Sequence, residues 1–316
     1  MSRTKLLQIG SMSDRMRDAL AEAFEIDVLS EQSDRASFLA ERGGDYPAIV
    51  TTAGLPGDVL DAAAKLRVVS SFGVGYDSID ASACAARGIK VSHTPDVLND
   101  EVANTFVMLW LAVSRDLLGS ERHARSGAWA SEGSYPLTRS IQGRRVGILG
   151  LGRIGQAIAE RCKVFDAEIH YHSRSRKDVP YTYHDTPAAL AEAVEVLVAI
   201  TPGGAETEHL VDAEVLTALG PDGLFFNLAR GSVADEAALI EALLNGRIAG
   251  AGLDVFEAEP KIPDALKEME NVVLLPHVGS ATHETRAAMG DLVVRNLLQW
   301  QEDGTVVTPV PECRDL

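Results

Sequence analysis

The 316-residue sequence has little cysteine, few aromatic residues and no long apolar run. Its three cysteines, Cys84, Cys162 and Cys313, lie far apart without any CxxC spacing, which argues against a disulfide framework and against a metal site. We therefore expect no bound metal and a reducing compartment, the cytoplasm. The longest strongly apolar stretch, residues 106–113, is far shorter than the ~20 residues that a membrane-spanning helix needs. We expect no membrane partner.

Basic residues are also scarce, because 29 lysines and arginines face 46 aspartates and glutamates and the formal net charge is -17. Nucleic acid or an anionic membrane surface would be repelled at long range, so we expect neither as a partner. An anionic substrate would need a local cation. The first ten residues hold neither a long apolar segment nor an Arg- and Ser-rich amphipathic pattern, and we expect no targeting signal there.

Two series of short β-rich runs alternate with helix-compatible segments, which is typical of parallel α/β sheets. Helical spacing of apolar residues predicts one long buried helix over residues 99–117 and a last helix over residues 283–301, while residues 125–142 form a looser excursion. The sequence predicts two doubly wound α/β domains. The predicted strands are residues 6–9, 26–29, 48–52, 67–72 and 89–92 in the first series, and 146–149, 168–172, 196–201, 224–228, 252–256 and 272–275 in the second.

A glycine-rich turn follows the first strand of the second series and opens a helix-friendly run. In this strand, GxGxxG, helix order, the first glycine permits a tight turn, the second lets backbone approach a pyrophosphate and the third lets helix and strand pack closely. The alternative is a chance glycine cluster. The βαβ context favours a dinucleotide site, whose turn is Gly150, Leu151, Gly152, Arg153, Ile154 and Gly155.

The next strand lacks the acidic residue that usually holds the ribose hydroxyls of NAD, and ends instead in Ser173, Arg174 and Ser175. Two hydroxyls and a guanidinium are suitable partners for a 2′-phosphate. We predict NADP as the cofactor, with NADPH preferred over NADH. The alternative is an ordinary basic surface loop.

Three candidate catalytic residues follow other strands. Arg230 comes after an apolar strand, where α/β sheets bind ligands, and would supply the cation that an anionic substrate needs. His277 ends another apolar run and, as a histidine, can donate a proton on reduction and accept one on oxidation. Glu259 would hold the imidazolium form by pairing with it. Taken singly, each residue has a non-catalytic alternative. Arg230 could form a surface salt bridge, His277 could be a structural histidine at a strand end, and Glu259 could be an ordinary loop carboxylate.

In the first series, residues 70–77 follow a strand and offer backbone amides that form a nest for an anion, although two glycines after a strand usually mark only a turn. This segment, residues 94–103, the glycine-rich turn, and the segments around Arg230, Glu259 and His277 together resemble the D-isomer-specific 2-hydroxyacid dehydrogenase family. Within it the pattern is most similar to glyoxylate/hydroxypyruvate reductases and hydroxyphenylpyruvate reductases.

The resemblance implies reduction of a small 2-oxo acid to the D-2-hydroxy acid, with Arg230 orienting the substrate, His277 donating the proton and Glu259 pairing with His277. It implies substrate contacts at Val74 and Gly75. Leu55 replaces part of the family's usual Asn/Gly-rich turn and would cap the pocket, which leaves glyoxylate, hydroxypyruvate or an aryl pyruvate open. The further cofactor contacts that it implies are Thr201, Pro202, Ala229, Asp254 and Gly279.

The resemblance also implies a homodimer with a discontinuous substrate domain, residues 1–98 and 284–316, and an inserted Rossmann nucleotide-binding domain, residues 99–283. The substrate domain would be flavodoxin-like. One alternative function is a non-catalytic NADP-sensing module, since fold does not fix function. Another is a formate dehydrogenase, in which a glutamine commonly accompanies the histidine; Glu259 favours keto-acid reduction instead.

Overall fold

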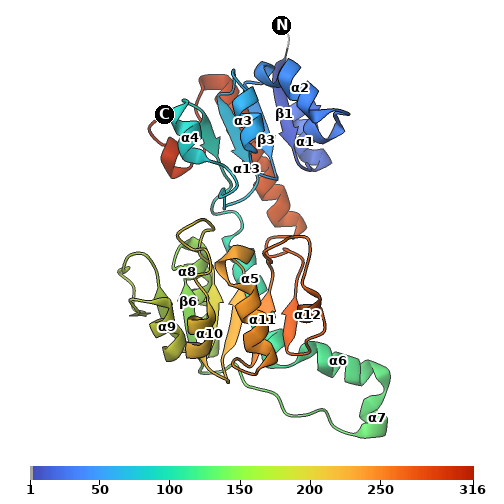
Figure 1. Cartoon of the computed structure of the whole chain (residues 1–316), viewed down its shortest axis with the longest axis vertical. Helices are drawn as coiled ribbons and strands as arrows, with labels where there is room; N and C mark the ends of the chain where they lie inside the picture. The colour runs from blue at the N-terminus through green and yellow to red at the C-terminus, as the bar shows by residue number, and fades with distance from the viewer. Residues whose placement is uncertain (1–2) are drawn as a thin grey trace. The chain divides into compact units, whose positions relative to one another are not determined.

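A computed structural model describes residues 3–316. The chain divides into two compact units, one formed by Met1–Leu98 with Ala281–Leu316 and the other by Asn99–Ser280. The predicted domain boundary at residues 283–284 lies close to the second division and stays a prediction. Figure 1 shows a parallel sheet flanked by helices in each unit.

The first unit contains a five-stranded parallel sheet with the order β2-β1-β3-β4-β5, which is the flavodoxin-like order. Its strands are β1 Thr4–Ile9, β2 Phe24–Val28, β3 Ala48–Thr51, β4 Val68–Ser71 and β5 Lys90–Ser92. Its helices are α1 Asp14–Ala21, α2 Arg35–Arg42, α3 Gly57–Ala62, α4 Ala81–Ala86 and α13 His283–Asp303, with 3-10 turns η1 Leu29–Glu31, η2 Gly43–Asp45 and η5 Pro311–Cys313.

Alternation along the strands fills both faces of this sheet, because successive side chains of a strand point to opposite sides. On β1, Leu7 packs with residues of α2, α3 and α4, whereas Leu6 packs with residues of α1 and α13. The sheet is therefore doubly wound, as the sequence predicted. The last predicted helix is confirmed and runs two residues farther than expected, to Asp303.

The second unit contains a seven-stranded parallel sheet, β12-β11-β10-β9-β6-β7-β8, in which the chain reverses direction across the sheet between β6 and β9 as in a Rossmann fold. Its strands are β6 Arg145–Leu149, β7 Glu168–His172, β8 Thr182–Tyr183, β9 Val196–Ala199, β10 Leu224–Asn227, β11 Gly250–Leu253 and β12 Val272–Leu274. Its helices are α5 Asn99–Ser114, α6 Leu117–Ser126, α7 Ala128–Glu132, α8 Arg153–Cys162, α9 Pro187–Ala193, α10 Ala213–Leu219, α11 Glu236–Leu244 and α12 Asp264–Lys267, with 3-10 turns η3 Lys163–Phe165 and η4 Gly231–Val233.

One face of this sheet packs against α9, α10 and α11 through a continuous apolar cluster. On the other face, α5 packs beside α8, and Phe106 of α5 meets Phe226 of β10 edge to face at 5.4 Å between ring centroids. The expectation of one helix over residues 99–117 is wrong, because α5 ends at Ser114. Asp116 there has a φ of 43°, and its carboxylate caps the next helix by accepting from the Gly119 amide at 3.2 Å.

The excursion predicted over residues 125–142 begins earlier in the structure, with α6, and continues through α7 and an extended segment; we call residues 117–140 the arm. No residue of the arm is buried. Figure 1 shows α6 and α7 standing away from the seven-stranded sheet. Within residues 3–316, no single helix is long and apolar enough to cross a membrane; α5 and α6 reach that length only as a pair bent by 59°.

Candidate active site

Arg230, Glu259 and His277 lie beyond the ends of three neighbouring strands. Arg230 follows β10, Glu259 follows β11 and His277 follows β12, and these strands are parallel and adjacent. Since the carboxyl ends of parallel strands meet at one edge of a sheet, all three residues belong to loops at the edge where α/β proteins bind ligands.

His277 and Glu259 form a direct pair, with 2.8 Å between Nδ1 of the ring and Oε2 of the carboxylate. The other oxygen, Oε1, accepts a hydrogen bond from the Phe256 amide at 3.1 Å, which fixes the carboxylate. The His277 side chain is 50% exposed, so a substrate can reach it. Because Nδ1 is used by Glu259, the ring nitrogen that can act on a substrate is Nε2.

The backbone of His277 is unusual, with a φ of 53° that only glycine and a few polar residues adopt easily. Its amide donates to the Asp254 carbonyl oxygen at 2.9 Å. Strain of about 1–3 kcal/mol at such a residue persists only where the surrounding contacts enforce it. Here the contacts that enforce it come from the end of the neighbouring strand, β11.

Asp254 supplies those contacts. Its side chain is 3% exposed, and its two oxygens accept from consecutive backbone amides, Val278 at 2.7 Å and Gly279 at 2.8 Å. Burial raises the pKa of the Asp254 carboxyl above its ordinary value, although the two hydrogen bonds pull it down in part. A Cβ on Gly279 would lie 2.8 Å from the Asp254 carboxylate, which explains the glycine.

Arg230 lies in a turn that is braced by Asn227, a residue that our sequence analysis did not single out. The Asn227 side-chain amide donates to the Arg230 carbonyl oxygen at 2.9 Å, and its oxygen accepts from the Ala229 amide at 3.1 Å. The Arg230 guanidinium also donates to the Ala229 carbonyl oxygen at 2.9 Å. A polar residue at the end of the apolar strand β10 was the available signal for this brace.

The glycine-rich turn has a shape that suits a pyrophosphate. Gly150 has a φ of 101°, and a Cβ on Gly155 would overlap the Gly150 carbonyl oxygen, so the turn and the start of α8 pack without space between them. At Gly152, in contrast, a Cβ would meet nothing within 4 Å, and no side chain caps α8. The first amides of α8 therefore face an open approach suited to phosphate.

Thr201 and Pro202 follow β9, and Ala229 follows β10, on the same edge of the sheet. The hydroxyl oxygen of Thr201 is buried and has no hydrogen-bond partner among the described residues. A buried polar atom without a partner is costly, and a bound ligand would supply one.

The loop after β7 carries Ser173, Arg174 and Ser175. The Ser173 hydroxyl donates to the Ser175 carbonyl oxygen at 2.8 Å, which closes a tight turn. Arg174 is exposed and forms an ion pair with Glu206 at 3.3 Å between Nη1 and Oε2. A ligand phosphate that approached Arg174 would have to compete with the Glu206 carboxylate.

Leu55, Val74 and Gly75 lie in the first unit. Leu55 is buried, and its amide donates to the Ser78 carbonyl oxygen at 3.1 Å. The Val74 carbonyl oxygen lies 2.9 Å from Nδ1 of His93. Their role toward a substrate stays a prediction. Among residues 3–316, no group of three or more His, Cys, Asp or Glu residues is arranged to hold a metal ion.

The model of one protein family matches residues 107–279, and its description is "D-isomer specific 2-hydroxyacid dehydrogenase, NAD binding domain". Among curated relatives, the hydroxyphenylpyruvate reductase of Plectranthus scutellarioides is 44% identical over 96% of this chain and 98% of its own length. The glyoxylate/hydroxypyruvate reductase A of Arabidopsis thaliana is 42% identical over the same shares.

A solved structure with a TM-score of 0.94 is that of an NADPH-dependent glyoxylate/hydroxypyruvate reductase from Sinorhizobium meliloti in complex with NADP and malonate. It is 48% identical in sequence, and the match covers 99% of this chain and 98% of that one. The two-unit architecture is thus shared along the whole chain.

Proposed function

We propose, from the premise that this chain belongs to the D-isomer specific 2-hydroxyacid dehydrogenase family, that it reduces a small 2-oxo acid to the D-2-hydroxy acid with NADPH. The observation that carries the proposal is the hydrogen-bonded pair of His277 and Glu259 at the strand edge that also carries Arg230. An acid held by a carboxylate, beside a fixed guanidinium, is what reduction of a keto acid needs.

Four side chains of the protein have separate roles in the reaction. Arg230 binds the substrate carboxylate through its guanidinium and keeps the carbonyl group in place. His277 gives the proton on Nε2 to the carbonyl oxygen as that oxygen becomes an alkoxide. Glu259, bonded to Nδ1, holds the ring in position and stabilises its charged form. Asp254 keeps the backbone after His277 from moving.

The nucleotide site fits a nicotinamide dinucleotide by its shape and by its donors. When bound, such a cofactor supplies the hydride for the carbonyl carbon. Residues 150–155 offer backbone amides to its pyrophosphate, and the Thr201 hydroxyl gains the partner it lacks. Ser173, Arg174 and Ser175 bind the 2′-phosphate of NADP. Pro202, Ala229, Asp254 and Gly279 line the remainder of the site. We assign the second unit to cofactor binding and the first to the substrate.

For the substrate, we propose glyoxylate and hydroxypyruvate, the acids in the names of two of the relatives. An aryl pyruvate is the second candidate, because the relative from Plectranthus scutellarioides is named for hydroxyphenylpyruvate. The backbone amides of Val74 and Gly75 would hold the substrate carboxylate, and Leu55 would limit the size of its side chain.

An assay of cofactor oxidation tests the function directly. NADPH and NADH are compared in parallel with glyoxylate, hydroxypyruvate, pyruvate and phenylpyruvate. The oxidation of formate is followed separately, as reduction of NADP+ or NAD+. We expect the fastest turnover with NADPH and the two small keto acids. A preference for phenylpyruvate would select the aryl branch. Tight NADPH binding without turnover of any acid would favour a sensing module, and turnover of formate alone a formate dehydrogenase.

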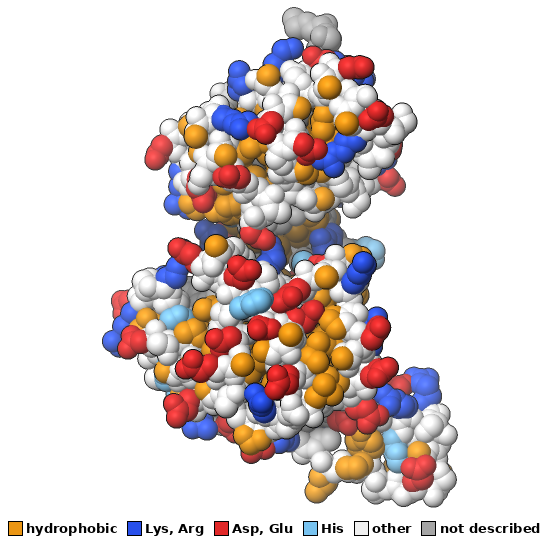
Figure 2. Space-filling view, in the orientation of Figure 1, with side chains coloured by type: hydrophobic (Ala, Val, Ile, Leu, Met, Phe, Trp, Pro, Cys, Tyr) orange, Lys and Arg blue, Asp and Glu red, His pale blue; other side chains and the backbone are white. Residues whose placement is uncertain are grey.

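We also propose that the protein is a homodimer and that it acts in the cytoplasm. The arm supports the first point, since its two helices have no buried residue in their own chain and packing against a partner would stabilise them. Trp129 is 69% exposed and Leu137 is fully exposed. Figure 2 shows hydrophobic side chains on the surface where the arm leaves the unit. The three buried, unpaired cysteines are consistent with a reducing compartment.

A further inference from the structure

Two loops of the second unit and the start of α11 are tied together by side chains that have no role in the mechanism above. Glu257 and Glu236 exchange hydrogen bonds through their backbones: the Glu236 amide donates to the Glu257 carboxylate at 3.2 Å, and the Glu257 amide donates to the Glu236 carboxylate at 3.3 Å. His209 adds the second loop, because its Nε2 lies 3.1 Å from the same Glu257 oxygen, Oε1. We call these three residues the loop clamp.

The loop clamp lies close to both catalytic loops along the chain. Glu257 is separated from Glu259 by a single residue, Ala258, and the Glu259 carboxylate itself is bonded to the Phe256 amide. The His209 amide donates to the Ser232 carbonyl oxygen at 2.8 Å, in the turn that Arg230 begins. The clamp therefore restrains the two loops that carry the guanidinium and the carboxylate of the proposed reaction.

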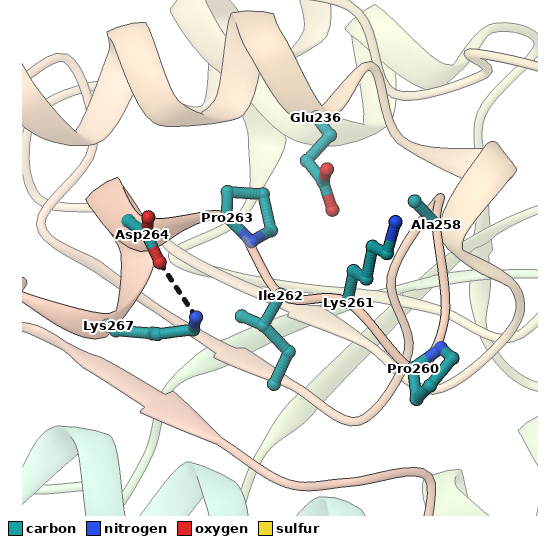
Figure 3. A pocket seen from close by; sticks show the side chains of 8 residues that line it. All are labelled: Glu236, Ala258, Pro260, Lys261, Ile262, Pro263, Asp264 and Lys267. Carbon is teal, nitrogen blue, oxygen red and sulfur yellow. Dashed lines mark hydrogen bonds and ion pairs between the residues drawn. The ribbon is translucent and has the colours of Figure 1, made fainter.

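The loop after β11 borders an open pocket on one side, so contacts on that side do not fix its shape. Residues 258 and 260–263 line an open pocket of about 530 Å³, together with Glu236 of α11 and residues of α12. Figure 3 shows the Glu236 and Lys261 side chains extending toward this pocket, while Lys267 is paired with Asp264. A loop that borders solvent on one side keeps its shape mainly through polar ties.

The clamp contains two carboxylates, and the His209 ring provides a hydrogen-bond donor for one of them. Two carboxylates that come close to each other repel. Burial, together with the neighbouring charge of Glu257, raises the pKa of the Glu236 carboxyl. The hydrogen bond from the Glu257 backbone amide lowers this pKa in part. His209 is a side chain that donates to the Glu257 carboxylate, and it does so from a backbone with a φ of 49°. Such strained backbone at a non-glycine residue is expected where a side chain has to be aimed.

We propose that His209 and Glu257 are positioning residues that hold Glu259, and through it the imidazole of His277, in the geometry for proton transfer. The proposal rests on the proposed keto-acid reduction for its kinetic readout, but its structural readout does not depend on turnover. Neither side chain touches the reacting groups.

The kinetic test is a double-mutant cycle with the full-length protein. We expect Glu257→Ala to lower kcat about 10-fold or more, with KM for the keto acid and the Kd of NADPH changed less than about 2-fold, because displacement of a proton donor slows the chemical step rather than binding. Glu257→Gln, whose amide oxygen still accepts from the Glu236 amide, should retain most of the rate. Glu268→Ala, an exposed glutamate on the other side of α12, is the matched control and should leave kcat unchanged.

The same Glu257→Ala change is then made in a Glu259→Gln background, where it should lower kcat by less than about 2-fold because the group it positions has already been altered. An equal loss in both backgrounds would overturn the proposal. His209→Ala is tested in the same two backgrounds, the wild type and Glu259→Gln. It provides the test of the proposal if Glu257→Ala does not fold.

A measurement without turnover separates this proposal from the proposed function. In a proton NMR spectrum of the protein with labelled histidine, the Nδ1 proton that His277 donates to Glu259 should give a downfield signal. We expect Glu257→Ala and His209→Ala to remove or broaden this signal and Glu268→Ala to keep it. A signal unchanged in both clamp variants would contradict the positioning role, even if no keto acid were turned over.

Discussion

Gly231 lies against the backbone of Phe256 so closely that a Cβ on Gly231 would overlap the Phe256 carbonyl group and the Glu257 amide. The turn that begins at Arg230 is therefore in contact with the loop that carries Glu259. The glycine is required here because two backbones approach closely. Its φ lies outside the left-handed region, so a positive φ is not the reason.

Gly231→Ala should therefore damage both stability and catalysis. Because the obstructing atoms are backbone, one loop has to move, at a cost of about 1–3 kcal/mol in the free energy of unfolding, and kcat should fall at least about 10-fold. Denaturant unfolding and steady-state kinetics measure the two effects. Gly57→Ala is the control, since a Cβ there meets nothing within 4 Å, and it should be neutral. A Gly231→Ala variant with normal kcat would show that this contact does not position Arg230.

The preference for NADPH should depend on Arg174 and be opposed by Glu206. Arg174→Ala should weaken NADPH binding about 10-fold, the effect of one charge-assisted hydrogen bond at an exposed site, and leave NADH nearly unchanged. Glu206→Gln should strengthen NADPH binding, because the carboxylate no longer competes with the 2′-phosphate for Arg174. Fluorescence titration with both cofactors measures these constants, with Arg176→Ala as the control from the same loop. Equal losses for the two cofactors would contradict the assignment of Arg174.

The strands of both sheets other than β8 could be predicted from the sequence, because they are short apolar runs that end at polar residues. The strand β8 was missed, since Thr182–Tyr183 is only two residues long and has no apolar pattern. The break in the helix over residues 99–117 was missed because apolar spacing continues to Leu117, while the local backbone of Asp116 interrupts the helix. Periodicity indicates which residues can be buried in a helix. It cannot predict that a single residue adopts the left-handed conformation and ends the helix.

At the site, the sequence could single out candidate residues but not the contacts that support them. Arg230, Glu259 and His277 stand out as polar residues after apolar strands. The link between His209 and Glu257 joins residues 48 positions apart, in loops without a regular pattern, so it follows only from how the loops meet. The brace from Asn227 is local, and a search for polar residues at strand ends would have found it.

His277→Gln should lower kcat by a factor of about 10²–10⁴, the usual contribution of a positioned acid, and leave the Kd of NADPH within about 2-fold of the wild type. The glutamine fills a similar volume, so the fold should be kept. Glu259→Gln should have a smaller effect, since it removes the charge that stabilises the imidazolium and leaves the ring present. Stopped-flow single turnover isolates the chemical step. Parallel losses of rate and of NADPH affinity in His277→Gln would point to misfolding or to a binding role instead.

The stability of the protein should fall in alkaline solution, partly because of Cys162. Burial raises the pKa of this thiol from 9.0 to about 12. The unfolded chain therefore loses the proton first as pH rises, so the contribution of Cys162 to stability is present below pH 9.0 and is lost progressively from there to about pH 12. The free energy of unfolding, measured at about pH 8 and about pH 10, should decline less in Cys162→Ala than in the wild type. Identical slopes would refute a buried, protonated Cys162.

Exposed apolar side chains on the arm should determine the oligomeric state. Trp129 is 69% exposed and Leu137 is fully exposed, so Leu137→Glu and Trp129→Ala should each shift the proposed dimer to monomer without loss of folded structure. Sedimentation velocity over a range of concentrations measures the shift, and circular dichroism measures the fold. Val164 is 76% exposed and lies outside the arm, so Val164→Glu is the matched control and should keep the oligomeric state of the wild type. A dimer that survives both arm substitutions would place the interface elsewhere, because an interface built on these side chains cannot bury an unpaired glutamate at little cost.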